Sequence, residues 1–212
     1  MKRDKIMLYE YLIKNYKPNE PIFVSDVELS VSDDNLRQMF KTLCDAGKIK
    51  RFDIGIYYIP KKSILKNEVP LAADEVAVAK YINKKGKIEG FYSGYTFANQ
   101  LGISTQVPYV KEIVSNNAST RVREVNVRNK RIILRKARTP ITNDNYVVLQ
   151  LLDLLKDLEQ YYDIDFDEMC ERLTRYVKDE NITKVQVDKY IGEYPDKVYK
   201  NIYRTGLYNV FA

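Results

Sequence analysis

The spacing of hydrophobic residues predicts helices from the start of the chain. Apolar side chains recur every three or four positions over residues 5–16, which is typical of a helix that buries one face. Pro18 and Pro21 then end that helix, because proline lacks an amide proton and restricts the backbone. Ser25 and Glu28 have the spacing of a capping box, so we expect a short second helix to begin there.

A third helix and a hairpin follow in the pattern. Ser32 or Asp33 can cap this helix, and Gly47 is the residue at which we expect it to end. Its apolar face comprises Leu36, Met39, Phe40 and Leu43. Residues 48–59 have the pattern of two short strands joined by a turn near Gly55. The first 60 residues therefore contain three expected helices and then a hairpin.

Three helices followed by a two-stranded hairpin is the element order of a winged helix-turn-helix domain, which we place at residues 1–66. In such a domain the third helix enters the major groove of DNA, and the hairpin contacts the backbone or the minor groove. Asparagine and glutamine can pair with adenine and arginine with guanine, while lysine suits phosphate. The expected DNA-binding residues are Asn35, Arg37, Gln38, Lys41, Thr42, Lys50, Arg51, Lys61 and Lys62.

Two acidic residues keep a second interpretation of this domain open. Asp33 and Asp34 lie at the start of the third helix, where they stabilise the helix dipole but would repel DNA phosphates. Winged helices also serve as protein-interaction modules. That role is therefore the alternative to DNA binding for residues 1–66.

Residues 67–140 predict a central α+β domain, reached through a linker at residues 61–72. The pattern indicates two helices and a strand, and then a hairpin at residues 121–138 that turns at residues 128–130. Only Glu124 is acidic in this strongly basic hairpin. Its arginines could form a second nucleic-acid face or bind an acidic partner, or they could keep a sheet edge from pairing with another edge. These arginines are Arg121, Arg123, Arg131, Arg135 and Arg138.

The remainder, residues 141–212, predicts a helical segment. Leucine and valine recur at helical spacing after residue 145, and three further helices follow. Five tyrosines recur near the end of the chain, where we expect them to pack at the surface of a helix bundle, with base stacking and a homodimer contact as alternatives. They are Tyr190, Tyr194, Tyr199, Tyr203 and Tyr208.

The net charge of +6 is unevenly distributed along the chain. The first two expected domains are basic and residues 141–212 are acidic, which suggests different partners for the two parts. No apolar run is long enough for a membrane helix, and charges interrupt the apolar part of the N-terminus. We therefore expect a cytoplasmic protein with no membrane partner.

The residues that usually carry catalysis are missing or lack their partners. The chain has no histidine, and its two cysteines, Cys44 and Cys170, form no CxxC pair. Asp163, Asp165 and Asp167 resemble the start of a calcium loop, but Glu168 stands where that loop requires glycine. We expect a binding protein rather than an enzyme, with no catalytic residue, no metal site and no cofactor.

One stretch in the central region resembles a known family. The sequence GFYSGYTFANQLGISTQVPYVKEIVSNNAS, at residues 90–119, precedes the basic hairpin and the segment TPITNDNYVVLQLLDLL. Together they resemble the AbiEi family, the antitoxins of type IV toxin–antitoxin (abortive infection) systems. The resemblance covers about residues 1–160 and is most specific over residues 90–108.

That resemblance implies both a function and partners. Family members carry a winged-helix domain ahead of an antitoxin domain and repress transcription of their own promoter by binding inverted repeats in double-stranded DNA. The functional partner is a neighbouring nucleotidyltransferase-like toxin, which the antitoxin opposes without a stable complex. The alternatives are a winged-helix regulator without a toxin, and the protein-interaction module.

Overall fold

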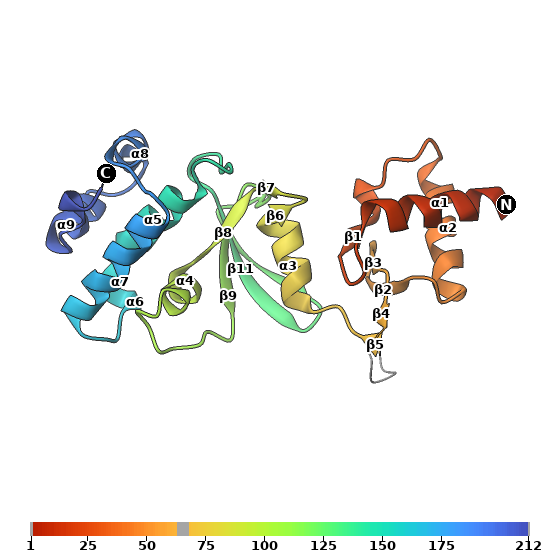
Figure 1. Cartoon of the computed structure of the whole chain (residues 1–212), viewed down its shortest axis with the longest axis horizontal. Helices are drawn as coiled ribbons and strands as arrows, with labels where there is room; N and C mark the ends of the chain where they lie inside the picture. The colour runs from red at the N-terminus through yellow and green to blue at the C-terminus, as the bar shows by residue number, and fades with distance from the viewer. Residues whose placement is uncertain (1, 63–67, 212) are drawn as a thin grey trace. The chain divides into compact units, whose positions relative to one another are not determined.

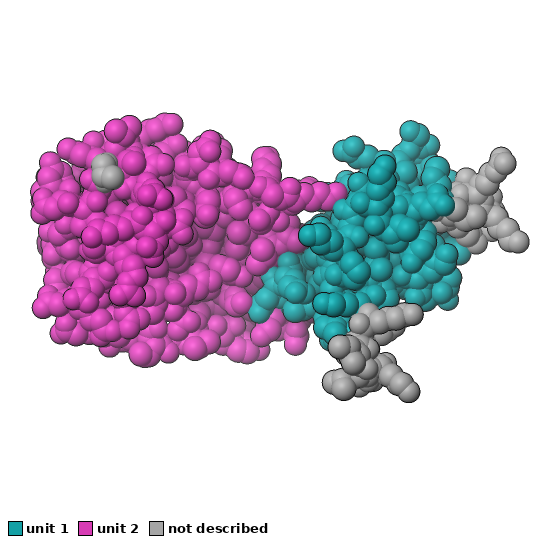
Figure 2. Space-filling view, in the orientation of Figure 1, with its two compact units in different colours: residues 1–76 teal, residues 77–212 magenta. Residues whose placement is uncertain are grey.

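A computed structural model describes residues 2–62 and 68–211 of the 212-residue chain. The chain divides into two compact units, Met1–Val76 and Ala77–Ala212, which Figure 2 distinguishes by colour. Both units mix helices with strands, and the chain ends in a helical region, as Figure 1 shows. The α+β class expected from the sequence is therefore confirmed. Among the described residues, no helix combines the length and the apolar character needed to cross a bilayer.

The described part of unit 1 is built on helices α1 and α2 and a small antiparallel sheet. The sheet order is β1-β3-β2, so the first strand pairs with the last one. In chain order the elements are α1 (Lys2–Asn15), β1 (Ile22–Phe23), the 3-10 turn η1 (Val24–Asp26), α2 (Asp33–Asp45), β2 (Lys50–Asp53) and β3 (Ile56–Tyr58). The predicted hairpin is confirmed, and its turn contains Gly55 with a positive φ of 70°.

The core of unit 1 forms between the two helices and the sheet. Phe40 of α2 is fully buried and packs against Tyr57 of β3 at a ring-centroid distance of 4.8 Å, with the rings tilted by 34°. Leu8 and Leu12 of α1 are equally buried. Each buried side chain of this size contributes about 2 kcal/mol through removal of apolar surface from water. The four residues predicted for the apolar face of α2 all belong to this core.

Both ends of α2 are set by local sequence. The Ser32 hydroxyl accepts a hydrogen bond from the Asn35 amide at 3.4 Å, so Ser32 is the N-cap. At the other end Gly47 has a φ of 69°, which few side chains tolerate. The Gly47 amide donates a hydrogen bond to the Cys44 carbonyl, and the Lys48 amide donates one to the Leu43 carbonyl. These two hydrogen bonds form a Schellman motif. The predicted limits of this helix are confirmed.

The prediction of a second helix after Ser25 is wrong. The chain forms only the 3-10 turn η1, and the Ser25 hydroxyl bonds the neighbouring Asp26 side chain instead of capping a helix. The Val24 amide donates to the Gly55 carbonyl at 3.0 Å, which continues the pairing of β1 with the hairpin. Valine also favours extended backbone because it branches at Cβ. A contact distant in sequence has therefore overridden the local capping signal.

The predicted linker is partly structured. Strands β4 (Lys61–Lys62) and β5 (Glu68–Val69) pair with each other on either side of residues 63–67. Asn19 connects this pair to the rest of unit 1, because its side chain donates to the Val69 carbonyl at 3.1 Å and accepts from the Lys61 amide at 3.4 Å. These two strands thus belong to unit 1.

Unit 2 is built on a four-stranded mixed sheet of order β10-β11-β9-β8. Strands β9 and β11 are parallel, and the two outer pairings are antiparallel. The strands are β8 (Gly90–Ser93), β9 (Lys111–Ser115), β10 (Val122–Val127) and β11 (Lys130–Lys136). Before the sheet come α3 (Ala73–Tyr81) and the hairpin of β6 (Asn83–Lys84) and β7 (Lys87–Ile88), and α4 (Gly94–Gln100) follows β8.

The C-terminal helices cover one side of this sheet. In Figure 1 they lie on the opposite side from α3. They are α5 (Tyr146–Lys156), α6 (Leu158–Tyr161), α7 (Phe166–Asp179), α8 (Lys184–Tyr190) and α9 (Lys197–Arg204), with the 3-10 turns η2 (Ile191–Glu193) and η3 (Leu207–Asn209). The helix α5 is buried on every side from Val147 to Leu155, because it lies between the sheet and the other helices.

One large hydrophobic core joins strands β8 and β9 to the C-terminal helices of unit 2. It extends from Phe91 in β8 to Leu207 in η3 and has α5 at its centre. The boundary predicted at residue 140 therefore does not separate two compact domains. Hydrophobic spacing identified the helices, but it could not show that they share a core with the sheet.

Candidate functional site

The outward face of α2 carries most of the expected DNA-binding residues. Asn35, Arg37, Gln38 and Lys41 are all exposed, because the apolar residues between them point into the core. Thr42 differs from these four, since it is half-buried and its hydroxyl donates to the Gln38 carbonyl at 2.9 Å. The helix thus presents two amides and two cations to solvent.

Arg37 has an acidic neighbour on the same helix. Its guanidinium lies 3.3 Å from the Asp34 carboxylate, and their side chains are 69% and 95% exposed. An ion pair with this much exposure is worth at most about 1 kcal/mol, so it exchanges readily for a stronger contact. Asp33 and Asp34 both lie in the first helical turn, where they complement the helix dipole.

The hairpin of unit 1 adds further cations. Lys50 and Arg51 of β2 are exposed, as is Lys61 of β4, and the Arg51 Nε atom donates to the Asp53 carbonyl at 3.3 Å. The side chain of Lys62 lies outside the described residues. Ile54, at the turn of the hairpin, is 82% exposed. Its position was missed in the sequence because a lone isoleucine beside glycine carries no periodic signal.

The five arginines of the second basic set do not share one face. In the β10–β11 ladder, opposite residues point to the same side of the sheet. Arg123 lies opposite the buried Leu134, whereas Arg135 points to the other side, where it pairs with Glu112 of β9 and lines a groove beside α5. Arg131 is exposed and lies 3.8 Å from Glu124. Register, which hydrophobic spacing does not reveal, has separated residues that are close in sequence.

Three of those arginines meet in a groove of unit 2. Arg121, Arg135 and Arg138 line a cavity of about 790 Å³ together with Lys136 of β11 and Lys156 of α5. The sequence did not indicate Lys136 and Lys156 as part of this site. The remaining lining residues are Phe91, Val114, Ser119, Val122, Ala137, Thr139, Ile141, Leu149, Asp153 and Tyr194.

The inner cations of this groove are paired with carboxylates. Arg135 forms an ion pair with Glu112 of β9, and both side chains are largely buried. Lys156 lies 2.8 Å from Asp153, whose other oxygen accepts from the Ser93 hydroxyl at 2.5 Å. Burial opposes the charge on Arg135, but the Glu112 and Asp153 carboxylates outweigh it and raise the Arg135 pKa. These contacts join β8, β9, β11 and α5.

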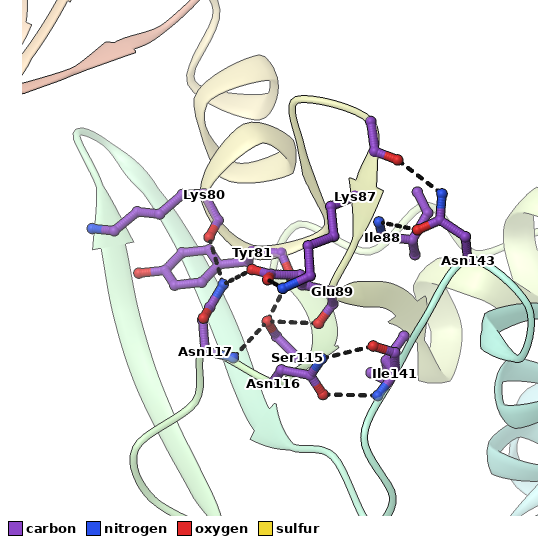
Figure 3. Close-up of polar contacts among 11 residues, drawn as sticks. Lys80, Tyr81, Lys87, Ile88, Glu89, Ser115, Asn116, Asn117, Ile141 and Asn143 are labelled. Atoms are coloured by element: carbon purple, nitrogen blue, oxygen red, sulfur yellow. Dashed lines mark hydrogen bonds and ion pairs between the residues drawn. The ribbon is translucent and has the colours of Figure 1, made fainter. Parts of the chain in front are cut away.

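A second polar cluster lies at the opposite end of β9, and Figure 3 shows it in detail. The Ser115 hydroxyl donates to the Tyr81 carbonyl at 2.6 Å and accepts from the backbone amide of Asn117 at 3.1 Å. Asn116 makes a reciprocal pair of bonds with the backbone of Ile141, at 2.8 and 2.9 Å. These side chains are bound to backbone groups of the chain, so the cluster fixes loops rather than binding a substrate.

Two further side chains complete the cluster of Figure 3. The Glu89 carboxylate lies 2.5 Å from the Lys87 ammonium group and accepts a hydrogen bond from the side-chain amide of Asn117 at 2.8 Å. The hydrogen bonds from Lys87 and Asn117 lower the Glu89 pKa. Asn143 bonds Ile88 and Gly86 of the β6–β7 hairpin. Asn145 occupies the N-cap position of α5.

Gly90 lies where three segments of the backbone pack closely together. A Cβ atom at this position would lie 2.2 Å from the Tyr81 carbonyl oxygen and 2.7 Å from the Val114 carbonyl oxygen. Only glycine allows the end of α3, β8 and β9 to approach this closely. The glycine is thus required by packing.

Two carboxylates in residues 163–168 accept hydrogen bonds from backbone amides. Asp163 accepts from the Thr105 amide at 2.9 Å, and Asp165 caps α7 by accepting from the amide of Asp167. In the described part of the chain, no three histidine, cysteine, aspartate or glutamate side chains cluster in a way that could hold a metal ion. Hydrogen bonding to the Thr105 backbone lowers the Asp163 pKa.

Of the five tyrosines predicted to pack in the C-terminal region, Tyr190 is half-buried, and the others are either buried or exposed. Tyr194 is buried, and its hydroxyl donates to the Leu149 carbonyl at 3.2 Å. Tyr199, Tyr203 and Tyr208 are exposed, and the last two stack at a centroid distance of 4.9 Å. Packing therefore accounts for Tyr194, and the exposed rings lie at the surface of the helical region.

The fold and these sites describe a two-unit α+β protein with an exposed amide- and cation-bearing helix in one unit and a basic groove in the other. The chain belongs to a family of unknown function, DUF6088, whose model matches residues 9–185. That match spans both units, so their combination is a property of the family. No curated protein and no solved structure matches the chain.

Proposed function

We propose that this protein binds double-stranded DNA through unit 1, folded as a winged helix-turn-helix domain. The observation that carries the proposal is the outward face of α2, where Asn35, Arg37, Gln38 and Lys41 are exposed beside the β2–β3 hairpin. The sheet order β1-β3-β2 supports it, because the strand between the helices completes the sheet of the wing. The turn η1 takes the place of the middle helix.

The dimensions of α2 suit the major groove. Its 13 residues span about 20 Å, and the groove, about 12 Å wide, admits an α-helix. Asn35 and Gln38 can read adenine, Arg37 can read guanine, and Lys41 can bind phosphate. Lys50, Arg51 and Lys61 would bind the DNA backbone beside the helix. On binding, Arg37 would exchange its ion pair with Asp34 for a contact with the DNA.

We further propose that the protein is the antitoxin of a type IV toxin–antitoxin system and represses its own promoter. The support is the resemblance over residues 90–108 together with a DNA-binding unit ahead of it. The expected partners are inverted repeats in the promoter and a nucleotidyltransferase-like toxin. The alternative is a winged-helix regulator with no toxin, and a homodimer through the exposed tyrosines would match inverted repeats in either case.

A salt-titrated binding assay tests the DNA proposal. The full chain is titrated against its own upstream DNA and against unrelated DNA of equal length. We expect tighter binding to the upstream fragment and a steep loss of affinity with salt, because each phosphate contact releases counterions. Equal binding of both fragments would contradict autorepression, and no binding to either would favour the protein-interaction module.

A double variant tests the assigned face. Arg37→Ala plus Lys41→Ala should lower the affinity for the upstream fragment by about 10- to 100-fold and make the salt dependence shallower. The control is Lys178→Ala plus Lys200→Ala, which removes the same charge from exposed sites in unit 2. Equal affinity of the two double variants would reject α2 as the reading helix.

Co-expression tests the antitoxin role separately. A nucleotidyltransferase-like gene adjacent to this one should arrest growth when expressed alone, and the full chain should restore growth. The Arg37→Ala plus Lys41→Ala variant should still restore it, because autorepression and toxin neutralisation are different activities in such a system. A missing neighbour, or no rescue, would favour the regulator without a toxin.

A further inference from the structure

The groove between the sheet and α5 in unit 2 has a basic rim that internal ion pairs do not neutralise. Its inner cations, Arg135 and Lys156, are bound to Glu112 and Asp153. The outer cations Arg121, Lys136 and Arg138 have no such partner. Among the residues that the structure describes, no carboxylate lies within ion-pair distance of these three side chains. The rim therefore carries an excess of positive charge.

The lining of the same groove mixes apolar side chains with polar and charged ones. Phe91, Val114, Ile141 and Leu149 form part of its wall and belong to the hydrophobic core. Those four side chains are nearly fully buried, whereas Val122 of β10 also lines the groove and is 55% exposed, so a ligand can contact it. The groove thus offers apolar surface to a ligand next to its cations.

Arg138 is already oriented by its neighbours. Its guanidinium lies 5.5 Å from the centre of the Tyr194 ring, and its Nη1 atom donates to the Glu193 carbonyl at 3.2 Å. The Tyr194 ring is held in turn by its hydrogen bond to Leu149. Holding a guanidinium in place in advance lowers the entropy cost of binding an anion.

Size and charge together narrow the ligand class. The volume of about 790 Å³ lies within the range of about 300–1,000 Å³ for small-molecule sites and far exceeds one inorganic anion. Two arginines and a lysine favour phosphate, which a guanidinium can bind through two parallel hydrogen bonds. The exposed apolar surface of Val122 favours an organic group beside that phosphate.

We propose that this groove binds a nucleotide, with its phosphates at Arg121, Lys136 and Arg138 and its base against the apolar wall that includes Val122. The cations come from side chains, so binding needs no divalent metal. The site lies wholly in unit 2 and is independent of the DNA-binding face of α2. Either proposal can fail without the other.

Isothermal titration of the full chain in EDTA tests the proposal. The ligands are ATP, GTP, CTP and UTP, with adenosine, guanosine and inorganic tripolyphosphate as partial ligands. We expect at least one nucleotide to bind one-to-one with a Kd below about 100 µM. Its nucleoside and tripolyphosphate should each bind at least about tenfold more weakly, because each offers only half of the contacts.

Two variants test whether nucleotide binding depends on the groove itself or only on the overall positive charge of the protein. Arg121→Gln plus Arg138→Gln should weaken nucleotide binding by about tenfold or more, whereas Lys178→Gln plus Lys200→Gln should leave it unchanged. Val122→Arg adds positive charge but fills the apolar side of the groove, so it should also weaken binding. If electrostatic attraction alone were responsible, Val122→Arg would instead strengthen it.

Three results would overturn the proposal. One is the absence of nucleotide binding up to millimolar concentration, and another is equal binding of tripolyphosphate and nucleotide. The third is full affinity in the Arg121→Gln plus Arg138→Gln variant. That variant should keep its affinity for upstream DNA and its thermal stability, which shows that the loss is local to the groove.

Discussion

At the scale of single residues, several positions between residues 90 and 119 have structural roles. Gly90 permits a close approach of three segments, and Ser115 and Asn116 bind backbone groups from distant parts of unit 2. Such positions are sensitive to substitution because no neighbouring group can replace them. The stability of unit 2 should therefore depend on them more than on any surface charge.

Replacing Gly90 with alanine should destabilise unit 2 by about 2–4 kcal/mol, because the added Cβ would overlap two backbone carbonyl oxygens that cannot move independently. Urea unfolding followed by a signal from unit 2 measures this change. The matched control is Gly192→Ala, where the Cβ meets no atom within 4 Å. A similar effect of both substitutions would refute the packing role of Gly90.

Ser115→Ala should lower the free energy of unfolding of unit 2 by about 1–3 kcal/mol. The serine is fully buried, and its loss leaves the Tyr81 carbonyl and the Asn117 amide without this partner. The exposed Ser119 provides the control, since Ser119→Ala should change stability by less than about 0.5 kcal/mol. Equal stabilities for the two variants would argue against the clustered hydrogen bonds.

At the scale of elements, local signals in the sequence were sufficient where the structure is also local. The limits of α2 and the β2–β3 turn follow from caps, glycines and hydrophobic spacing within a few residues. The turn η1 could not be predicted in this way, because the hydrogen bond from the Val24 amide to the Gly55 carbonyl spans 31 positions. Which arginines of the basic hairpin face α5 depends on strand register and on the parallel pairing of β9 with β11, which no local pattern encodes.

The Schellman motif at the end of α2 gives a graded prediction for that element. Gly47→Ala should destabilise unit 1 by about 1–2 kcal/mol, since alanine disfavours the left-handed conformation at a φ of 69°. Gly47→Asn should cost less, because asparagine adopts this conformation more readily. Thermal unfolding of unit 1 measures both, and a larger loss for asparagine than for alanine would contradict the motif.

At the scale of the whole molecule, each unit has a core of its own. The core of unit 1 centres on Leu12 and Phe40, and that of unit 2 centres on α5. Hydrophobic spacing predicted most of the helices that build these cores. It did not predict that the sheet and the C-terminal helices form one unit, because that depends on which faces meet.

Two core substitutions should therefore act on different units. Leu12→Ala should lower the stability of unit 1 by about 2–5 kcal/mol, and Leu151→Ala should do the same to unit 2, since both leucines are fully buried. Native-state hydrogen exchange resolves the two effects, because it reports stability residue by residue. Equal loss of protection in both units for either variant would show that the units unfold together.

Unit 2 should lose stability in acid. Hydrogen bonds from Lys87 and Asn117 lower the pKa of Glu89, and hydrogen bonds at Thr105 and Ser104 lower the pKa of Asp163. Their unfolded forms bind protons more readily, so their contribution is present above the unfolded pKa of about 4 and is lost as pH falls through the lower folded values. Urea unfolding between pH 7 and about pH 2 measures it, and Glu89→Gln should flatten the dependence. A stability of unit 2 that does not fall in acid would contradict these contacts.

The central position of α5 also has a consequence for the order in which the chain folds during synthesis. Unit 1 has all of its core residues once the ribosome has made residues 1–76. The helix α5 emerges later and needs α9 to cover it, since Asn201 of α9 donates to the Leu155 carbonyl and Val198 and Ile202 of α9 are buried. Until the last helix emerges, α5 therefore exposes leucines on the nascent chain, and that interval is when unit 2 is most open to aggregation and to chaperones.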